Sequence, residues 1–517
     1  MTGNREHRAL RSTAVFTAFN YAGLAASFVS VPLLLRCLGN ESYGLMLTAL
    51  AFMNYLSFSD AGLNWGSIVL ISAAHGREDR EAMATIFRHS VVLAFGSAVL
   101  VVGAGCGLFI AAHHGWRLPM FSSHPEADNL VLIVAAQCAV NLTANTVYSV
   151  FQAIQESYWT ALYQGCARLA GTIGGIIAAF CYQSAALVLL ANVMALVVFA
   201  FAAGCHLWKK CPWVFERGSL ADVAQYSLQL RTGAKSFGLQ IARTIQGTAP
   251  VMVISSLAGP AFVPSYSVPA TLIGMVFGVF MSWNVSLQPA YGASWAADDR
   301  KWVVGAFRRT LNSVLLQGLV GGVAFVIVAP ELISLWTHGV LHPSEAMCGS
   351  VAVVLMVQAV SSTVQFCLAG INQHRRIAAI ELLHSVCAIF CAIAAVRWIG
   401  PEGVGIGAAV AYGATASWLG FRELAERLGS GEVVPRSLWI ARILLIGAAA
   451  IAVGTMIVKL MPFGGVIAAL TGAVGGSVLA AATVVWGTIL FRVNSREDWN
   501  VWVAALKGLP GRLLRRS

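Results

Sequence analysis

Three ionisable side chains interrupt long apolar segments of the sequence. Arg168 and Arg243 each lie near the middle of such a segment, and Asp60 lies within a third. A charged side chain at the centre of a bilayer costs about 2.5–3.5 kcal/mol, so it faces a bundle interior or water and is a functional candidate. Guanidinium groups bind phosphate oxygens bidentately and keep their charge away from water. The two arginines therefore predict a diphosphate site; the alternative is that each is buried against backbone carbonyls between helices.

Two roles are open for Asp60 at this depth. It is either the counter-ion of an arginine or a proton carrier, and one role does not exclude the other. Arg36 ends the first apolar segment on its outward side, where it either receives the diphosphate after crossing or extends to the lipid headgroups.

Four uncharged polar residues at membrane depth are candidates for contacts with sugar hydroxyls. Hydrogen bonds between helices explain them equally well. These residues are Asn20, Gln137, Asn141 and Gln246.

The sequence lacks the motifs of nucleotide, metal and covalent chemistry. His113, His114 and His124 share a segment expected to face outward, which we interpret as a solvated loop rather than a metal site. The eleven cysteines form no CxxC pair, and there is no GxxxxGK[ST], no GxSxG and no GxGxxG after a strand. We therefore expect no metal, no cofactor and no enzymatic activity.

The composition requires that membrane-spanning helices position these residues. Of the 517 residues, 58% are hydrophobic and 11% are charged, against roughly 45–50% and 25% in soluble domains. A water-soluble fold of this length is excluded. Because roughly 20 apolar residues cross a bilayer, the sequence predicts fourteen spans. They are 12–35, 43–74, 89–112, 128–152, 157–181, 184–206, 233–257, 264–294, 310–329, 347–371, 377–399, 403–420, 439–461 and 465–491.

The basic residues predict the orientation of these spans. An even number of spans places both termini on one side, and that side carries all but six of the 33 Lys and Arg residues. Cytoplasmic loops are enriched in Lys and Arg, so we expect both termini in the cytoplasm and the chain in a bacterial inner membrane. The net charge of +11 therefore indicates orientation rather than binding of nucleic acid.

An internal repeat relates the two halves of the chain. Gly39, followed by Tyr43, and Gly259, followed by Tyr266, each end a helix that runs outward, and the two glycines are 220 residues apart. A six-span offset is typical of transporters built from two parallel repeats. The sequence thus predicts an all-α polytopic membrane protein with two six-helix lobes and two further helices.

The repeat also sets the expected domains. We expect an N-terminal lobe at 1–206, a cytoplasmic linker at 207–232, a C-terminal lobe at 233–421, two additional helices at 422–491 and a basic amphipathic tail at 492–517.

Two local expectations concern charge and length. The span 43–74 is longer than a bilayer core, so we expect it to bend at 57–62.

Glu381 lies within two turns of a pair of arginines, and we interpret it as a juxtamembrane charge. Trp283 and Asn284 stand in the second lobe where the first has Asp60, so ion coupling through the second lobe is not expected.

Five segments carry a resemblance to a known family. They are RCLGNESYGL at 36–45, SDAGL at 59–63, QAIQE at 152–156, GINQHRR at 370–376 and GPEGVG at 400–405. Together with the span count, they resemble the Wzx-type polysaccharide flippases of the multidrug/oligosaccharidyl-lipid/polysaccharide exporter superfamily. The sequence departs from that family near Arg243, where the family often has an acid and this chain has QGTAP at 246–250.

The resemblance implies a fold and an activity. It implies two six-helix bundles in a V around a central cavity, with the last two helices outside. It also implies movement of an undecaprenyl-diphosphate-linked oligosaccharide to the outer leaflet by alternating access. Implied partners are this lipid, the membrane and, in the same synthesis, a polysaccharide polymerase and a chain-length regulator; we expect a monomer.

Three alternatives remain open. A drug or cation antiporter of the same superfamily would need acids in a lobe, and the sequence offers one deep acid against two deep arginines. A membrane polymerase or ligase would need a substantial outward loop with catalytic residues, and the predicted loops are short. A scaffold inactive in transport is the third.

Overall fold

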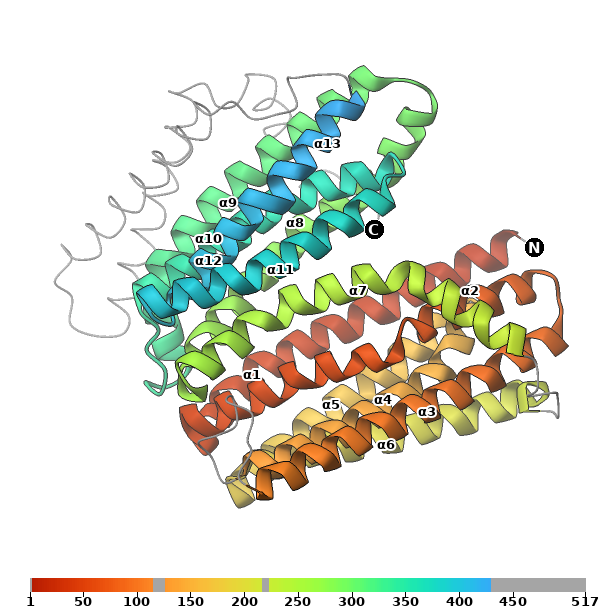
Figure 1. Cartoon of the computed structure of the whole chain (residues 1–517), viewed down its shortest axis with the longest axis horizontal. Coiled ribbons are helices and arrows are strands. Elements are labelled where there is room, and N and C mark those ends of the chain that lie inside the picture. Colours follow the sequence, from red (N-terminus) through yellow and green to blue (C-terminus); the bar gives the residue numbers. More distant parts are fainter. Residues whose placement is uncertain (1, 115–125, 216–222, 429–517) are drawn as a thin grey trace, which may run out of the picture. The chain divides into compact units, whose positions relative to one another are not determined.

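Helices joined by short turns form the described chain. The computed structural model describes residues 2–114, 126–215 and 223–428, and these ranges contain no strand (Figure 1). Nine helices in them are long and apolar enough to cross a membrane. The prediction of an all-α, multi-pass membrane protein is confirmed. The first twelve predicted spans coincide with helices, and the last two spans and the basic tail lie outside the described residues.

Contacts divide the chain into two compact units, Met1–Pro264 and Ser265–Ser517. The first unit contains α1 (Thr2–Leu56), α2 (Leu63–Gly76), α3 (Arg80–His113), α4 (Ala127–Ala153), α5 (Ser157–Tyr182), α6 (Ala185–Lys210) and α7 (Val223–Leu257), with short 3-10 helices η1 (Ser57–Asp60), η3 (Pro212–Phe215) and η4 (Pro260–Phe262). Because α7 packs along α1 and α2, it belongs to this unit. The division lies one helix later than the expected lobe boundary, and the grouping of spans into six and six stays a prediction.

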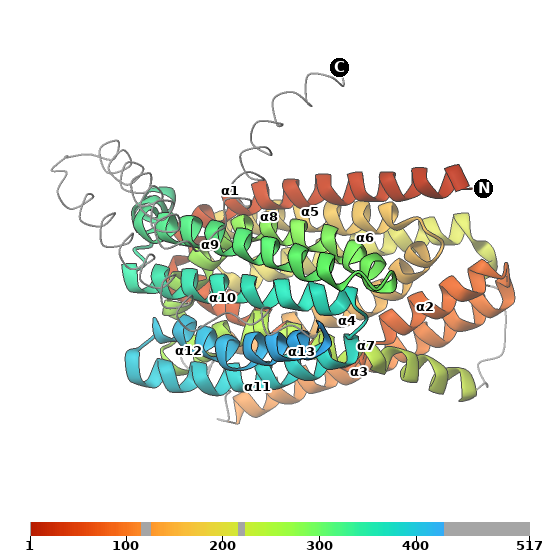
Figure 2. The same ribbon diagram turned by 90° about the horizontal axis from the view of Figure 1, so that it is seen from above.

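The second unit begins within α8 (Val263–Ala296). Its other helices are α9 (Arg300–Trp336), α10 (Glu345–Gly370), α11 (His374–Ile399), α12 (Gly403–Tyr412) and α13 (Trp418–Leu428), and a π-helix η5 (Gly413–Ser417) joins the last two. α11 and α10 both pack on α12, and the three lie side by side in both ribbon views (Figures 1 and 2). A hydrophobic core around Phe307, Val364 and Phe421 joins α9, α10 and α13.

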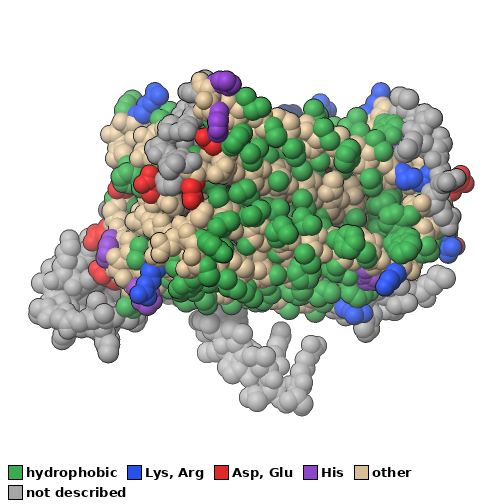
Figure 3. All heavy atoms as spheres, turned by 90° about the horizontal axis from the view of Figure 1, so that it is seen from below, with side chains coloured by type: hydrophobic (Ala, Val, Ile, Leu, Met, Phe, Trp, Pro, Cys, Tyr) green, Lys and Arg blue, Asp and Glu red, His purple; other side chains and the backbone are tan. Residues whose placement is uncertain are grey.

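Side-chain types are segregated along the helices. Hydrophobic side chains cover the middle of the visible face in Figure 3, and the coloured charged side chains gather toward its two ends. Side chains cap some of the helix starts: Asp79 accepts a hydrogen bond from the Ala82 amide at the start of α3, and Ser344 accepts one from the Met347 amide at the start of α10. Such caps stabilise a helix by about 1 kcal/mol each.

Two glycines form the corners predicted from the repeat. Gly39 has φ 74° and ψ 171° and divides α1 into two helices, and Gly259 has φ 100° before η4. Positive φ values are cheap only for glycine. The first corner packs on the second, because a β-carbon built at Gly44 would lie 1.8 Å from the carbonyl oxygen of Pro260.

The predicted bend at 57–62 is also present. The helix changes to the 3-10 helix η1, Ala61 and Gly62 follow with φ 46° and 78°, and α2 starts at Leu63. Here the backbone of α7 comes very close, since a β-carbon built at Gly62 would lie 2.5 Å from the carbonyl oxygen of Gly233. The break therefore creates a close crossing between two chain segments that are far apart in sequence.

Candidate functional site

The guanidinium of Arg168, a residue of α5, packs against α1. At one level Phe19 of α1 fills the space over Gly165 of α5. One turn further along both helices, a β-carbon built at Gly23 of α1 would lie 3.4 Å from Nη1 of Arg168. A glycine on each helix thus makes room for the large side chain of the other. The Arg168 side chain is exposed, and no ion pair to it occurs in the described ranges.

Asn20 is the polar neighbour of this arginine on α1. It precedes Gly23 by three residues, so the two share a face of the helix, and its side chain is exposed. Asn20, whose amide can both donate and accept hydrogen bonds, thus lies on the face of α1 against which Arg168 packs.

Arg243 lies at a similar depth on α7. At 1.5 Å per residue, it is about 21 Å from the C-terminal end of α7, and Arg168 is about 21 Å from that of α5. Both helices pack against α1. The Arg243 side chain is exposed, as is Arg36 three residues before the Gly39 corner.

Asp60 closes η1 and holds the start of α2. Its Oδ2 accepts a hydrogen bond of 3.5 Å from the Asn64 amide, and its side chain is partly buried. No ion pair from Asp60 to Arg36, Arg168 or Arg243 occurs within the described residues. The roles of counter-ion and proton carrier both stay predictions.

The surroundings of Asp60 are polar and incompletely satisfied. Cys138 of α4 lies 3.9 Å from the Ser57 hydroxyl. Oδ1 of Asn64, four residues after Asp60, and Oε1 of Gln137, which precedes Cys138, are buried and accept no hydrogen bond in the part of the chain that the structure describes. Leaving a buried acceptor unsatisfied costs about 1–3 kcal/mol. These amide oxygens are therefore suited to accept from water or from a hydroxyl of a bound molecule.

The other polar candidates are less open. Asn141 and Gln246 are both partly buried, and Gln246 already makes a polar contact in the structure. Asn284 stands in the second unit at the position that corresponds to Asp60 in the first. It is buried and donates to the Thr363 hydroxyl at 3.2 Å. No group of three potential metal-ligating side chains occurs among the residues the structure describes, and His124 lies outside them.

Glu381 was wrongly interpreted as a juxtamembrane charge. Its side chain is only 2% exposed, and it accepts a hydrogen bond from Nε2 of Gln365 on α10. The sequence did hold a signal, because His384 and Ser385 follow at three and four residues and place further polar groups on the same face of α11. This spacing indicates burial of Glu381 more directly than its nearness to the arginines in sequence indicates exposure.

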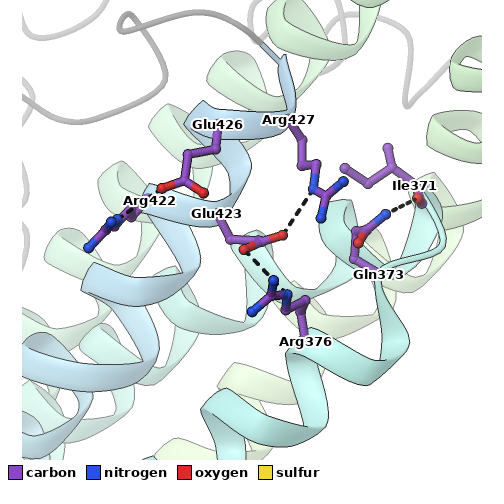
Figure 4. A network of polar contacts seen from close by, with 7 residues as sticks. All are labelled: Ile371, Gln373, Arg376, Arg422, Glu423, Glu426 and Arg427. Carbon is purple, nitrogen blue, oxygen red and sulfur yellow. Dashed lines mark hydrogen bonds and ion pairs between the residues drawn. The ribbon is translucent and has the colours of Figure 1, made fainter.

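A charged network links α11 to α13 in the second unit. Glu423 accepts from Arg427 at 3.0 Å and pairs with Arg376 at 3.9 Å, as Figure 4 shows. The exposed pair Arg422–Glu426 lies beside it on α13. Exposed ion pairs contribute about 0–1 kcal/mol to stability. Glu423 is less exposed than its partners and pairs with an arginine on each helix, so it is the residue that links α11 to α13.

Long apolar helices, some of which carry exposed arginines, define a multi-pass membrane protein. The sequence profile of the family described as "Polysaccharide biosynthesis protein" matches residues 9–294, more than half of the chain. The protein belongs to this family, and the predicted resemblance is confirmed.

Solved structures share the fold at low sequence identity. "Lipid II flippase MurJ, inward closed conformation" matches with a TM-score of 0.67 and 13% identity, over 93% of this chain and 99% of that chain. A multidrug resistance MATE family transporter of the MOP superfamily, in its inward-facing conformation, matches with a TM-score of 0.60 and 17% identity, over 81% and 98%. A comparison with curated protein sequences finds no match.

Proposed function

We propose that the protein is a flippase that moves undecaprenyl-diphosphate-linked oligosaccharide repeat units across the bacterial inner membrane for the synthesis of a surface polysaccharide. The observation that carries this proposal is the placement of Arg168 near the middle of α5, where its exposed guanidinium packs against α1 at Gly23. Membership of the polysaccharide biosynthesis family supports it.

The diphosphate is the part of such a lipid that resists crossing. Its charges would enter a medium in which each costs several kcal/mol unless it is paired. Arg168 and Arg243 offer two permanently charged groups at similar depth on helices that both contact α1. Pairing with these groups lowers the energy of the diphosphate in transit, and no bond has to be made or broken.

The glycan needs hydrogen-bonding partners once it leaves water. Asn20 is exposed on the face of α1 that holds Arg168, and Oε1 of Gln137 is a buried acceptor without a donor in the described ranges. Asn141 and Gln246 add partly buried amides. We propose that these side chains contact sugar hydroxyls and that Arg36 receives the diphosphate at the outer end.

Similarity to MurJ favours a lipid-linked cargo over a drug. That protein is named for flipping lipid II, and a cargo of similar chemistry is proposed here. A drug or cation antiporter, the alternative suggested by the MATE structures, needs anionic groups in its path, whereas the exposed ionisable groups deep in α5 and α7 are arginines. A polymerase or ligase is disfavoured because the turn between α9 and α10 is only a short segment, 337–344.

The proposal also covers the orientation of the protein in the membrane, its oligomeric state and its partners. The excess of Lys and Arg on one side supports cytoplasmic termini. The chain acts as a monomer by alternating access and delivers repeat units to a polymerase and a chain-length regulator, for either lipopolysaccharide or exopolysaccharide.

Deletion followed by a leaflet assay tests the proposal. In a strain without a paralogue, lipid-linked repeat units are expected to accumulate in the inner leaflet, where an impermeant glycosidase or lectin in spheroplasts cannot reach them. Transport of the same lipid by purified protein in liposomes is the direct counterpart. Delivery of repeat units to the outer leaflet at the normal rate in the deletion strain would contradict the proposal.

A further inference from the structure

A buried polar cluster occupies the second unit, where none was expected. Glu381 and His384 of α11 are 2% and 0% exposed, and they lie three residues apart on one face of the helix. Glu381 is about 10 Å along the helix from its start at His374. The cluster therefore lies inside the span, beyond the charged network at the start of α11.

The hydrogen bonds of His384 determine which ring nitrogen carries its proton. The Thr415 hydroxyl donates to the Ala411 carbonyl at 2.5 Å, so its oxygen is left to accept. Nδ1 of His384 lies 3.0 Å from that oxygen and is therefore the nitrogen that donates. Nε2 then bears a lone pair, and it is buried with no hydrogen-bond partner in the described ranges. This lone pair can accept a proton.

A neutral amide of α10 donates a hydrogen bond to Glu381. Nε2 of Gln365 donates to Oε1 of Glu381 and also lies 3.3 Å from the Ser361 hydroxyl. The ring of Tyr412 contacts the ring of His384 at a tilt of 34°, with centroids 3.8 Å apart, and Tyr412 is close enough to Glu381 for an electrostatic interaction. An acid and an imidazole thus share one aromatic neighbour.

The groups around the pair come from three further elements. α10 contributes Gln365 and Ser361, α12 and η5 contribute Tyr412 and Thr415, and Tyr266 of α8 interacts electrostatically with Tyr412. On α11 itself the nearest basic side chains are Arg375 and Arg376 at its start, and Arg376 is paired with Glu423.

The local backbone supports a functional role. Thr415 sits within the π-helix η5, a form that is rare and occurs frequently at functional sites. The π-turn places the Thr415 hydroxyl against Nδ1 of His384, so it selects the tautomer that leaves Nε2 open.

We propose that Glu381 and His384 form a proton-binding site in the second unit, and that its loading with protons is coupled to movement of the lipid-linked cargo. The coupling rests on the proposed function; the proton site does not. A proton fits better than a metal ion because the pair offers only two potential metal ligands, and no group of three occurs within the described residues. Protonation also removes the charge of a carboxylate that is otherwise costly to bury.

Infrared difference spectroscopy of the full chain in detergent tests the site without any cargo. As pH is varied, the carbonyl stretch of a buried carboxylic acid should appear and disappear, and Glu381→Gln should abolish it while preserving the hydrogen-bonding shape. Thr415→Val should shift the midpoint because His384 loses its tautomer-selecting partner. Glu426→Gln, at an exposed acid, should leave the band unchanged. A titrating band that survives in Glu381→Gln would overturn the proton site.

Proteoliposomes then test the coupling. A pH gradient should accelerate transport of lipid-linked oligosaccharide by the wild type, and the acceleration should be lost in Glu381→Gln and reduced in His384→Gln. Acceleration by a sodium gradient instead, or an unchanged response in Glu381→Gln, would overturn it. If the band titrates but no lipid moves, the proposed function fails and the proton site stands.

Discussion

Nη1 of Arg168 lies 3.4 Å from the position that a β-carbon would take on Gly23. That distance is ordinary van der Waals contact, so a methyl group is tolerated but a longer side chain must displace the guanidinium. We expect Gly23→Leu to reduce transport strongly while Gly23→Ala leaves it near normal. Gly103→Leu on α3 is the control, because nothing lies within 4 Å of its β-carbon position. Equal transport by the two Gly23 variants would show that the position of Arg168 is unimportant.

Removal of the arginines themselves should weaken diphosphate binding. A hydrogen bond to a charged group contributes about 1.5–3 kcal/mol, so Arg168→Ala and Arg243→Ala should each lower affinity roughly ten- to a hundredfold. Arg168→Lys should be intermediate, since lysine keeps the charge but not the bidentate geometry. Binding of the lipid-linked oligosaccharide to purified protein measures this.

Arg422→Ala serves as the control for the loss of an arginine, because its exposed pair with Glu426 contributes little. Normal transport in the single variants and in the double variant of Arg168 and Arg243 would contradict the diphosphate site.

The bend at 57–62 could be predicted because it follows from length. A segment that is uniformly apolar but longer than a bilayer core must bend or leave the membrane, and SDAGL contains residues suited to a break. The corners at Gly39 and Gly259 were equally accessible, because positive φ makes glycine a local signal that needs no knowledge of packing.

Burial of Glu381 could not be predicted from charge alone. Its environment consists of Gln365 on α10 and Tyr412 on α12, which only packing brings to α11. The contact of Arg168 with Gly23 could not be predicted either. It depends on the register between α1 and α5, and no pattern within either helix encodes that register. Side-chain types thus predicted candidate residues, but their partners came from tertiary contacts.

Replacement of Asp60 separates its charge from its hydrogen bond. Asp60→Asn retains an oxygen that can accept from the Asn64 amide, so thermal stability should stay close to that of the wild type. Asp60→Ala removes the acceptor of this hydrogen bond and should cost about 0.5–1.5 kcal/mol, the usual net contribution of a hydrogen bond. Transport should fall in both variants because both lose the carboxylate. Unchanged transport and unchanged pH dependence in Asp60→Asn would remove the charge from the mechanism.

The crossing of Gly62 and Gly233 should tolerate no side chain. A β-carbon at Gly62 would lie 2.5 Å from the Gly233 oxygen, and one at Gly233 would lie 2.4 Å from the Gly62 oxygen. Both atoms are backbone and cannot rotate away, so each alanine variant should lose about 1–3 kcal/mol, as overpacked sites do. Gly62→Ala should lose more, because its φ of 78° adds about 1–2 kcal/mol for a residue with a β-carbon.

Thermal unfolding of detergent-purified variants measures this difference. Gly76→Ala, at the end of α2 with no atom within 4 Å of its β-carbon position, is the matched control and should unfold at the wild-type temperature or slightly above. Because α7 approaches the break through this backbone contact, separating the two glycines should also loosen α7 from α2. If Gly62→Ala and Gly233→Ala unfold together with Gly76→Ala, the close crossing does not hold in the protein.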